Sequence, residues 1–179
     1  MIHIQPENLV IIDIETAPEH ASFAELNNDW QELWQDKIAK QLPEGVAPEE
    51  FYPMRAGVMA EFAKVICISI AYFNKESNMT MRVKSFYGHD EKKILNEFTA
   101  TISKVAGMNS KWCFAGHNIK EFDIPFICRR LLINQLKIPA YLDFQNMKPW
   151  ETNIVDTFQY WRFGDYKNYT SLKLLAAAM

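Results

Sequence analysis

Five of the six residues at 9–14 are apolar, and Asp13 is the exception. A short run of this kind, rich in β-branched residues, predicts a buried strand at the centre of a sheet. Because successive strand side chains point to opposite faces, Asp13 and Glu15 share one face near the end of this strand. Neighbouring carboxylates repel each other, so the pair indicates either a site for a hard cation such as Mg²⁺ or Mn²⁺, or a strand end that lies in water.

A helical pattern follows the first strand. Ser22 and Glu25 have the spacing of a helix N-cap and its partner acid, and apolar residues then recur every three or four positions, which predicts an amphipathic helix over 22–40. Proline and glycine residues interrupt the pattern, which resumes over 49–62. We interpret 18–63 as a helical insertion between the first and second strands.

The remaining pattern alternates between the periods of strand and helix. Strands are predicted over 64–73, 79–87, 112–115 and 154–157, helices over 90–105, 122–136 and from Thr170 onward, and a loop over 139–151. The first two of these strands flank a polar turn at 74–78 and therefore predict a hairpin. This order of elements describes an α/β fold of three layers, a mixed sheet with helices on both faces.

The composition supports a single domain over 1–179. The chain has 179 residues, of which 49% are hydrophobic, and this is enough for a buried core. It has no signal-peptide pattern and no apolar run as long as a membrane span, so we expect a cytoplasmic protein without membrane contact. Its three cysteines lie in apolar segments without metal-site spacing, which is typical of reduced core residues.

The net charge is −3, but the charged residues are unevenly distributed along the chain. Residues 1–63 contain 12 acidic and 3 basic residues, whereas residues 64–179 contain 10 acidic and 16 basic residues. This asymmetry is compatible with a basic surface on a mildly acidic protein, and equally with lysines scattered in solvent.

A second group of polar residues follows the predicted strand 112–115. His117, Asn118 and Asp123 lie between the end of this strand and the start of the next helix. Taken alone, Asn118 is expected to shape a turn and Asp123 to cap the helix. Acids on the first strand and at this helix start are also able to converge at one end of the sheet.

The two groups, in this order, resemble the first two motifs of the DEDD family of 3′–5′ exonucleases, which have a ribonuclease H-like fold. Val10-Ile11-Ile12-Asp13-Ile14-Glu15-Thr16 is similar to the first motif, and Asn118-x-x-x-Phe122-Asp123 is similar to the second. The insertion, the strand after it, Val155-Asp156-Thr157 and Ser171-Leu172-Lys173-Leu174-Leu175 resemble the subgroup related to the proofreading domain of B-family DNA polymerases. The resemblance covers nearly the whole chain.

This resemblance implies a metal-dependent 3′–5′ exonuclease that hydrolyses phosphodiester bonds at nucleic-acid 3′ ends, with single-stranded DNA as the expected partner. Asp13, Glu15 and Asp123 correspond to the catalytic carboxylates that hold two divalent cations, Mg²⁺ or Mn²⁺. Their mutual repulsion is expected to raise at least one of their pKa values.

The resemblance also suggests contacts with substrate. Phe122 corresponds to an aromatic residue that stacks on the terminal base, although a core position under the helix start is an equal alternative. Thr16 follows the first motif, where the family's backbone approaches the terminal sugar, and Asn118 belongs to the second. Three basic residues near the second motif are candidates for steering the nucleic-acid strand, namely Lys120, Arg129 and Arg130. The alternative is that they lie on a solvated helix face.

One part of the family pattern is not found. The third motif contains a fourth acid, preceded by a tyrosine four residues earlier or a histidine five residues earlier. Asp165 follows Tyr160 by five residues, which is the histidine spacing with a different residue. Asp156 is not assigned as a ligand, because in the family this position ends a strand or caps a helix. We therefore expect a chain that lacks the C-terminal part of its domain and has impaired activity.

Two other functions are compatible with the sequence. One is a non-catalytic ribonuclease H-like module that binds nucleic acid or a protein partner, although two acidic motifs favour an enzyme. The other is a related RNA exonuclease, because no residue that reads a 2′-hydroxyl is identifiable.

Overall fold

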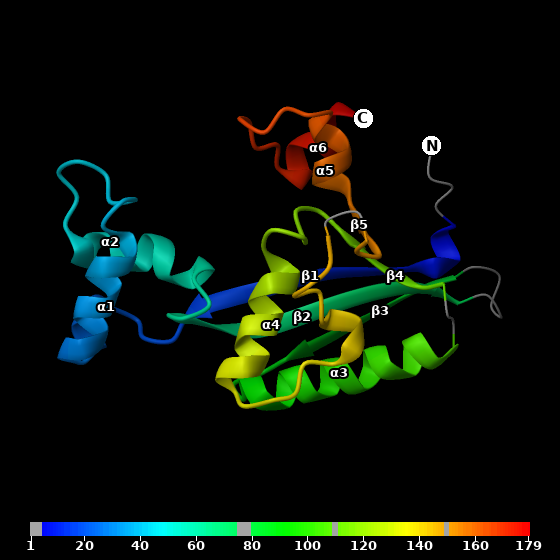
Figure 1. The fold of residues 1–179 in the computed structure, drawn as a ribbon, viewed down its shortest axis with the longest axis horizontal. Helices are drawn as coiled ribbons and strands as arrows, with labels where there is room; N and C mark the ends of the chain where they lie inside the picture. The colour runs from blue at the N-terminus through cyan, green and yellow to red at the C-terminus, as the bar shows by residue number, and fades with distance from the viewer. Residues whose placement is uncertain (1–4, 75–79, 109–110, 149–150) are drawn as a thin grey trace.

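The computed structural model describes residues 5–74, 80–108, 111–148 and 151–179. Within these residues, five strands form one mixed sheet in the order β3-β2-β1-β4-β5 (Figure 1). Their bounds are Leu9–Pro18 (β1), Ala63–Asn74 (β2), Thr80–Tyr87 (β3), Cys113–Gly116 (β4) and Ile154–Asp156 (β5). The central strand β1 is antiparallel to β2 and parallel to β4, and β2 and β3 pair as the predicted hairpin.

Helices lie on both sides of this sheet. In the described residues they are α1 (Asn28–Ile38), α2 (Pro48–Arg55), α3 (Glu91–Met108), α4 (Asp123–Ile133), α5 (Thr157–Arg162) and α6 (Leu172–Ala178). α3 and α4 lie on one side, and α5 and α6 lie on the other (Figure 1). The predicted α/β architecture is therefore confirmed. None of these helices is both long and apolar enough to cross a bilayer.

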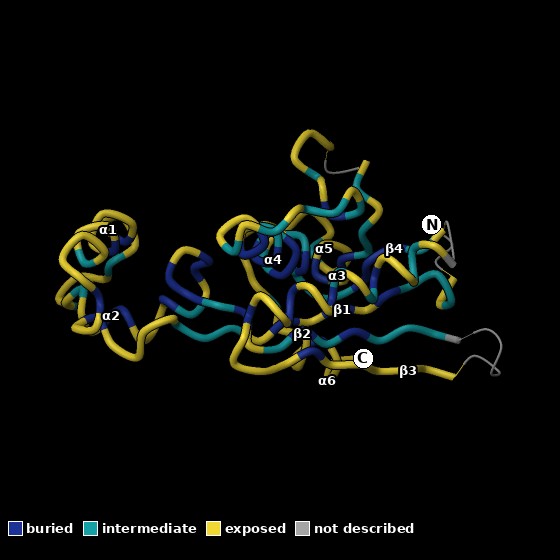
Figure 2. Tube along the Cα trace, turned by 90° about the horizontal axis from the view of Figure 1, so that it is seen from below, coloured by how far each residue is buried: buried dark blue, intermediate teal, exposed yellow. Residues whose placement is uncertain are grey.

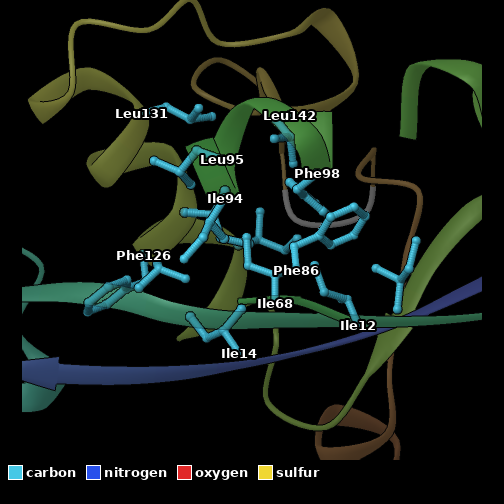
Figure 3. Close-up of a cluster of buried hydrophobic side chains, with 14 of the residues drawn as sticks. Ile12, Ile14, Ile68, Phe86, Ile94, Leu95, Phe98, Phe126, Leu131 and Leu142 are labelled. Carbon is cyan, nitrogen blue, oxygen red and sulfur yellow. The ribbon is translucent and has the colours of Figure 1, made fainter. Parts of the chain in front are cut away.

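The main core lies between the sheet and the helices α3 and α4. Ile12 and Ile14 of β1 point into it together with side chains from β2, β3, α3 and α4 (Figure 3). Each large side chain buried here stabilises the fold by about 1.5–3 kcal/mol. Because strand side chains alternate, the burial of Ile12 and Ile14 places Asp13 and Glu15 on the opposite face of the sheet.

The helices α1 and α2 form a second hydrophobic cluster to one side of the sheet (Figure 2). Its centre is Trp34, which is fully buried and whose ring lies 4.9 Å from that of Tyr52 and 5.1 Å from that of Phe62, measured between centroids. Edge-to-face contacts of this kind favour aromatic packing beyond the area that they bury. These three aromatic residues are therefore packing residues.

Several helix boundaries differ from the prediction. α1 begins at Asn28 rather than at Ser22, because the side chain of Asn27 accepts a hydrogen bond from the Trp30 N–H at 3.0 Å and caps the helix there. α2 ends at Arg55, before the predicted end of the pattern at Phe62. The apolar pattern did not predict the short helix α5. The turn predicted at 74–78 lies, apart from its first residue, outside the described residues.

A buried ion-pair network joins α4 to α3 and to the segment after β1. The guanidinium of Arg130 donates to both carboxylate oxygens of Glu91, at 2.8 and 2.6 Å, to Glu19 at 2.6 Å and to the carbonyl oxygen of Ala60 at 2.9 Å. Arg130 is only 3% exposed. Its predicted role in steering a ligand is therefore wrong, as is the alternative of a solvated helix face, because its charge is enclosed by acids from two other segments.

Replacement of Arg130 by Met should destabilise the fold strongly, because the buried Glu91 carboxylate would lose its cation. We expect the free energy of unfolding to fall by about 3–5 kcal/mol. Arg129→Met is the matched control, since Arg129 is exposed on the same helix and its replacement should change stability by less than about 0.5 kcal/mol. Urea unfolding measures both, and equal losses in the two variants would contradict the network.

Candidate functional site

The central strand β1 extends beyond its parallel neighbour. β4 pairs with β1 only along Leu9–Ile11, so the β4-side edge of β1 carries no strand beyond this point. The chain leaves β4 at Gly116, where an added Cβ would lie 2.8 Å from the carbonyl oxygen of Ile12 and 2.4 Å from the Ile119 side chain. A side chain at position 116 would therefore collide with β1, and glycine allows the chain to turn across its end.

Asp123, the first residue of α4, lies against this open edge. Its Oδ1 accepts a hydrogen bond from the backbone N–H of Ile14 at 3.0 Å, and Asp123 is only 4% exposed. The carboxylate thus satisfies a strand N–H that β4 does not reach. The expected capping role of Asp123 is wrong, because Phe122 occupies the N-cap position and the carboxylate binds β1.

The environment of Asp123 disfavours its charged form. Burial, followed by the negative charge of Asp13, raises the pKa of Asp123 to about 7, although the Ile14 N–H acts in the opposite direction. In the described part of the chain, no lysine, arginine or histidine forms an ion pair with it. A buried carboxylate beside a second acid, without a cation, is an electrostatically unfavourable arrangement.

Asp13 and Glu15 are both exposed on the face of β1 opposite the core. Asp13 is near enough to Asp123 for its charge to act on the buried carboxylate. The register of β1 against β2 shifts between Glu15 and Thr16, a β-bulge of the kind that re-aims side chains at a strand end. Among the described residues, no three histidine, cysteine or acidic side chains are arranged to hold a metal ion. The structure therefore brings Asp13 and Asp123 together but does not assemble a three-residue cluster.

The residues expected to contact substrate have mixed environments. The Thr16 hydroxyl donates to the carbonyl oxygen of Gly57 at 2.6 Å, so it is already engaged. Asn118 shapes the turn after β4, as expected, with a left-handed φ of 64°, and its buried Oδ1 has no hydrogen-bond partner among the described residues. Phe122 is half-buried and packs against Phe126, with 5.5 Å between ring centroids.

Asp156 fixes the turn that leads to Asp123. It is buried at the end of β5, where its carboxylate accepts from the N–H groups of Phe158 and Gln159 and so caps α5. The same carboxylate accepts from the backbone N–H of Asn118 at 2.9 Å and of Lys120 at 3.0 Å. This agrees with the helix-capping role that the family resemblance implied. Its hold on the 118–120 turn was not predicted.

His117 is a further contact that the sequence did not reveal. One ring nitrogen, Nδ1, lies 2.9 Å from the Thr157 hydroxyl, and Nε2 lies 2.8 Å from the carbonyl oxygen of Thr170. A carbonyl oxygen only accepts, so Nε2 is the donor in the second bond. His117 therefore ties the turn after β4 to α5 and to the segment before α6, and no local spacing pattern signals this.

A cavity of about 480 Å³ lies beside α4, apart from the acids. Its lining is mainly apolar and includes Ile124, Leu132 and Phe144, together with Lys120 and Arg129. Asp13, Glu15 and Asp123 do not line it. The three acids therefore lie outside the lining of this cavity.

Comparison with known proteins gives one family match. The model of a family described as a predicted 3′–5′ exonuclease related to the exonuclease domain of PolB matches residues 58–172. The match includes Asn118, Phe122 and Asp123, and begins after Asp13 and Glu15 in the sequence. No curated protein matches the chain.

Two solved structures match this chain. The family B DNA polymerase from the hyperthermophilic archaeon Pyrobaculum calidifontis has a TM-score of 0.50 at 12% identity, over 97% of this chain and 18% of the polymerase. E. coli Exonuclease I in complex with a dT13 oligonucleotide has a TM-score of 0.44 at 12% identity, over 91% of this chain and 32% of that chain. The chain thus spans less than a third of either protein. The likeness to the polymerase shows a ribonuclease H-like fold.

Replacement of Asp123 by Asn should stabilise the metal-free protein above neutral pH. The raised pKa means that Asp123 favours the folded state below about pH 4, and that this contribution is lost as the pH rises to the folded pKa near 7. Asn still accepts the Ile14 N–H but does not ionise. Its advantage over Asp should therefore grow by about 2.5 kcal/mol between pH 5 and pH 8, since the change covers nearly two pKa units and each corresponds to about 1.4 kcal/mol.

Urea unfolding in EDTA at the two pH values measures this change. Asp36→Asn on the exposed surface of α1 is the control, and its effect should not depend on pH in this range. A stability difference between Asp123→Asn and the parent chain that is the same at both pH values would show that Asp123 is ionised throughout.

Proposed function

Because this chain belongs to the family of predicted 3′–5′ exonucleases related to the exonuclease domain of PolB, we propose that it removes nucleotides from nucleic-acid 3′ ends in a reaction that depends on divalent cations. Single-stranded DNA is the proposed substrate. Phosphodiester hydrolysis needs a group that offsets phosphate charge, and this requirement directs attention to the acids at the end of β1.

The observation that supports this proposal best is the pair formed by Asp13 and Asp123. Asp123 is buried beside a second acid and has no ion-pair partner in the described residues. Carboxylate oxygens are the ligands that Mg²⁺ and Mn²⁺ prefer, and a cation beside this pair would remove the repulsion between its members. The donor set therefore fits a hard divalent cation, with Glu15 on the same exposed strand face as a third candidate ligand.

The side chains have distinct proposed roles in this site. Asp123 would hold a cation in a fixed position, because its carboxylate is fixed by the Ile14 N–H. Asp13 and Glu15 are exposed and free to rotate toward it. When bound, such cations lower the pKa of a bound water and offset charge on the phosphodiester. The turn at Asn118, fixed by Asp156, would keep Asp123 in register with β1.

We propose substrate contacts at groups that are not already engaged with other parts of the protein. The Oδ1 of Asn118 is buried without a partner in the described residues and is able to accept a hydrogen bond from a nucleotide. The half-buried ring of Phe122 lies next to Asp123 in the chain and offers a surface for base stacking, which any base tolerates. The Thr16 hydroxyl is engaged with Gly57, so the backbone at this position is the proposed contact.

A non-catalytic binding module is the second candidate. The hydrogen bond from Ile14 gives Asp123 a structural role that needs no cation, and no three-residue metal site is assembled in the described part of the chain. The two candidates differ in one property, namely cation-dependent shortening of DNA.

Incubation of a 5′-labelled oligothymidylate with the protein and Mn²⁺ should give a ladder of products shortened from the 3′ end. Asp13→Asn should slow this reaction by about a hundredfold or more, because the stabilisation that a bound cation supplies is worth several kcal/mol. The same variant should also bind Mn²⁺ more weakly, measured by the cation-induced rise in melting temperature, while its stability in EDTA holds or increases.

Asp36→Asn serves again as the control, because it removes an exposed carboxylate on α1, away from the sheet. Its rate and Mn²⁺ response should match those of the parent chain. Oligonucleotide binding without any Mn²⁺-dependent shortening would favour the non-catalytic module.

A further inference from the structure

Five exposed aromatic side chains lie within ten residues of sequence, on α5 and in the segment that follows it. We call this group the aromatic tract, and its members are Tyr160, Trp161, Phe163, Tyr166 and Tyr169. Large apolar residues that are exposed singly need no explanation, but a group of them marks a binding surface. The tract lies on the side of the sheet opposite α3 (Figure 1).

Contacts with neighbouring side chains position three members of the tract, Trp161, Tyr166 and Tyr169. Phe158 is almost fully buried, and the Tyr169 ring packs on it with 4.9 Å between centroids. The guanidinium of Arg162 lies 4.1 Å from the centre of the Phe158 ring and 5.2 Å from that of Tyr166. The Trp161 indole N–H donates to the Thr170 hydroxyl at 3.1 Å. These rings are therefore pre-positioned, which lowers the entropy that binding would cost.

Phe163 is the least expected member of the tract. It is 94% exposed and adopts a left-handed backbone conformation with φ of 45° at the end of α5. Glycine and asparagine adopt this conformation at low cost, whereas a bulky side chain is rare there. The fold thus keeps a phenyl ring in water at a position where a smaller polar residue would be more stable. Such an outlier suggests a function for the ring.

The charges around the tract favour an anionic partner. Residues 157–179 contain three basic side chains, Arg162, Lys167 and Lys173, and one acidic side chain, Asp165. Arg162 is paired with Glu121 at 2.6 Å, and the two lysines are exposed. Aromatic rings beside exposed cations are the combination with which proteins bind single-stranded nucleic acid, where bases stack on rings and lysines contact phosphates. An apolar protein partner would have no use for the cations.

The start of the helix that carries the tract lies near the acids. Asp156 caps α5, which carries the tract, and the same carboxylate holds the backbone of Asn118 and Lys120 ahead of Asp123. The charge of Asp156 acts on the pKa of Asp123, so the start of α5 is near the acid pair. A single nucleic-acid strand whose end lies at Asp123 is therefore able to continue over α5.

We propose that the aromatic tract binds single-stranded nucleic acid by stacking on its bases. The bound bases would lie on the 5′ side of the 3′ end that is held at the acid pair. The link to a reacting end rests on the proposed exonuclease function, whereas the binding itself does not. The tract would hold the strand without reading its sequence, because every base offers a flat face.

The test measures binding without cleavage. Fluorescence anisotropy of a labelled oligothymidylate in EDTA reports affinity for the parent chain, for Phe163→Asn and for Tyr166→Leu, which keeps an apolar side chain but removes the ring. We expect each variant to bind about tenfold more weakly, within the range measured for loss of one stacked base. Phe163→Asn should melt at the same or a higher temperature, because asparagine suits the left-handed conformation.

Matched controls separate this proposal from the exonuclease proposal. Leu33→Ala removes an exposed apolar side chain from α1 and should bind the oligonucleotide as the parent chain does. Because EDTA removes divalent cations, the affinities are measured in the absence of any cation-dependent cleavage. Loss of binding in the tract variants with unchanged melting supports the tract whether or not the parent chain cleaves.

Three results would overturn the proposal. The first is a parent chain that does not bind the oligonucleotide, and the second is unchanged affinity in both tract variants. The third is self-association of the parent chain that Phe163→Asn abolishes and that oligonucleotide does not displace, which would assign the tract to contact with a second copy. The salt dependence of Lys167→Gln gives further support if the slope of log affinity against log salt concentration is smaller by about 0.7. This is the change expected for one lost phosphate contact.

Discussion

The hydrogen bond from the Ile14 N–H to the Asp123 carboxylate is the contact on which the site depends. It exists because β1 continues past the end of β4 and leaves a strand edge open. A buried N–H at such an edge needs an acceptor, and here the acceptor is a carboxylate rather than a backbone carbonyl. This choice brings a second negative charge beside Asp13. The same bond therefore satisfies the open strand edge and buries the Asp123 carboxylate near Asp13. Burial, followed by the charge of Asp13, raises the pKa of Asp123 to about 7.

The position of Asp123 is fixed by contacts that come from late in the chain. Asp156 holds the 118–120 turn, and His117 ties this turn to Thr157 and Thr170. The carboxylate at the end of β1 is thus coupled mechanically to α5 and to the segment before α6. The turn itself contributes a core side chain, Ile119, so it is also anchored to the main core.

Much of the fold was predictable, because apolar alternation and helical periodicity are local properties of the sequence. The strands and the helix α4 follow from them, and two acidic motifs indicated Asp13 and Asp123. Features that depend on distant partners were not predictable. Arg130 looks like a surface cation until Glu91 and Glu19 are placed around it, and the bond from Asp123 to β1 requires knowledge of where β4 ends. α5 is too short for its periodicity to stand out.

The helix α4 contains two buried charged residues that the fold treats differently. Arg130 is surrounded by carboxylates and a carbonyl oxygen, so its burial is fully compensated. Asp123, two turns earlier, has a backbone N–H, an acidic neighbour and no ion pair among the described residues. Since the fold compensates one buried charge so completely, the arrangement at Asp123 is not a general tolerance of buried ions. It is local to the end of β1, where a bound cation would turn the repulsion between Asp13 and Asp123 into a favourable interaction.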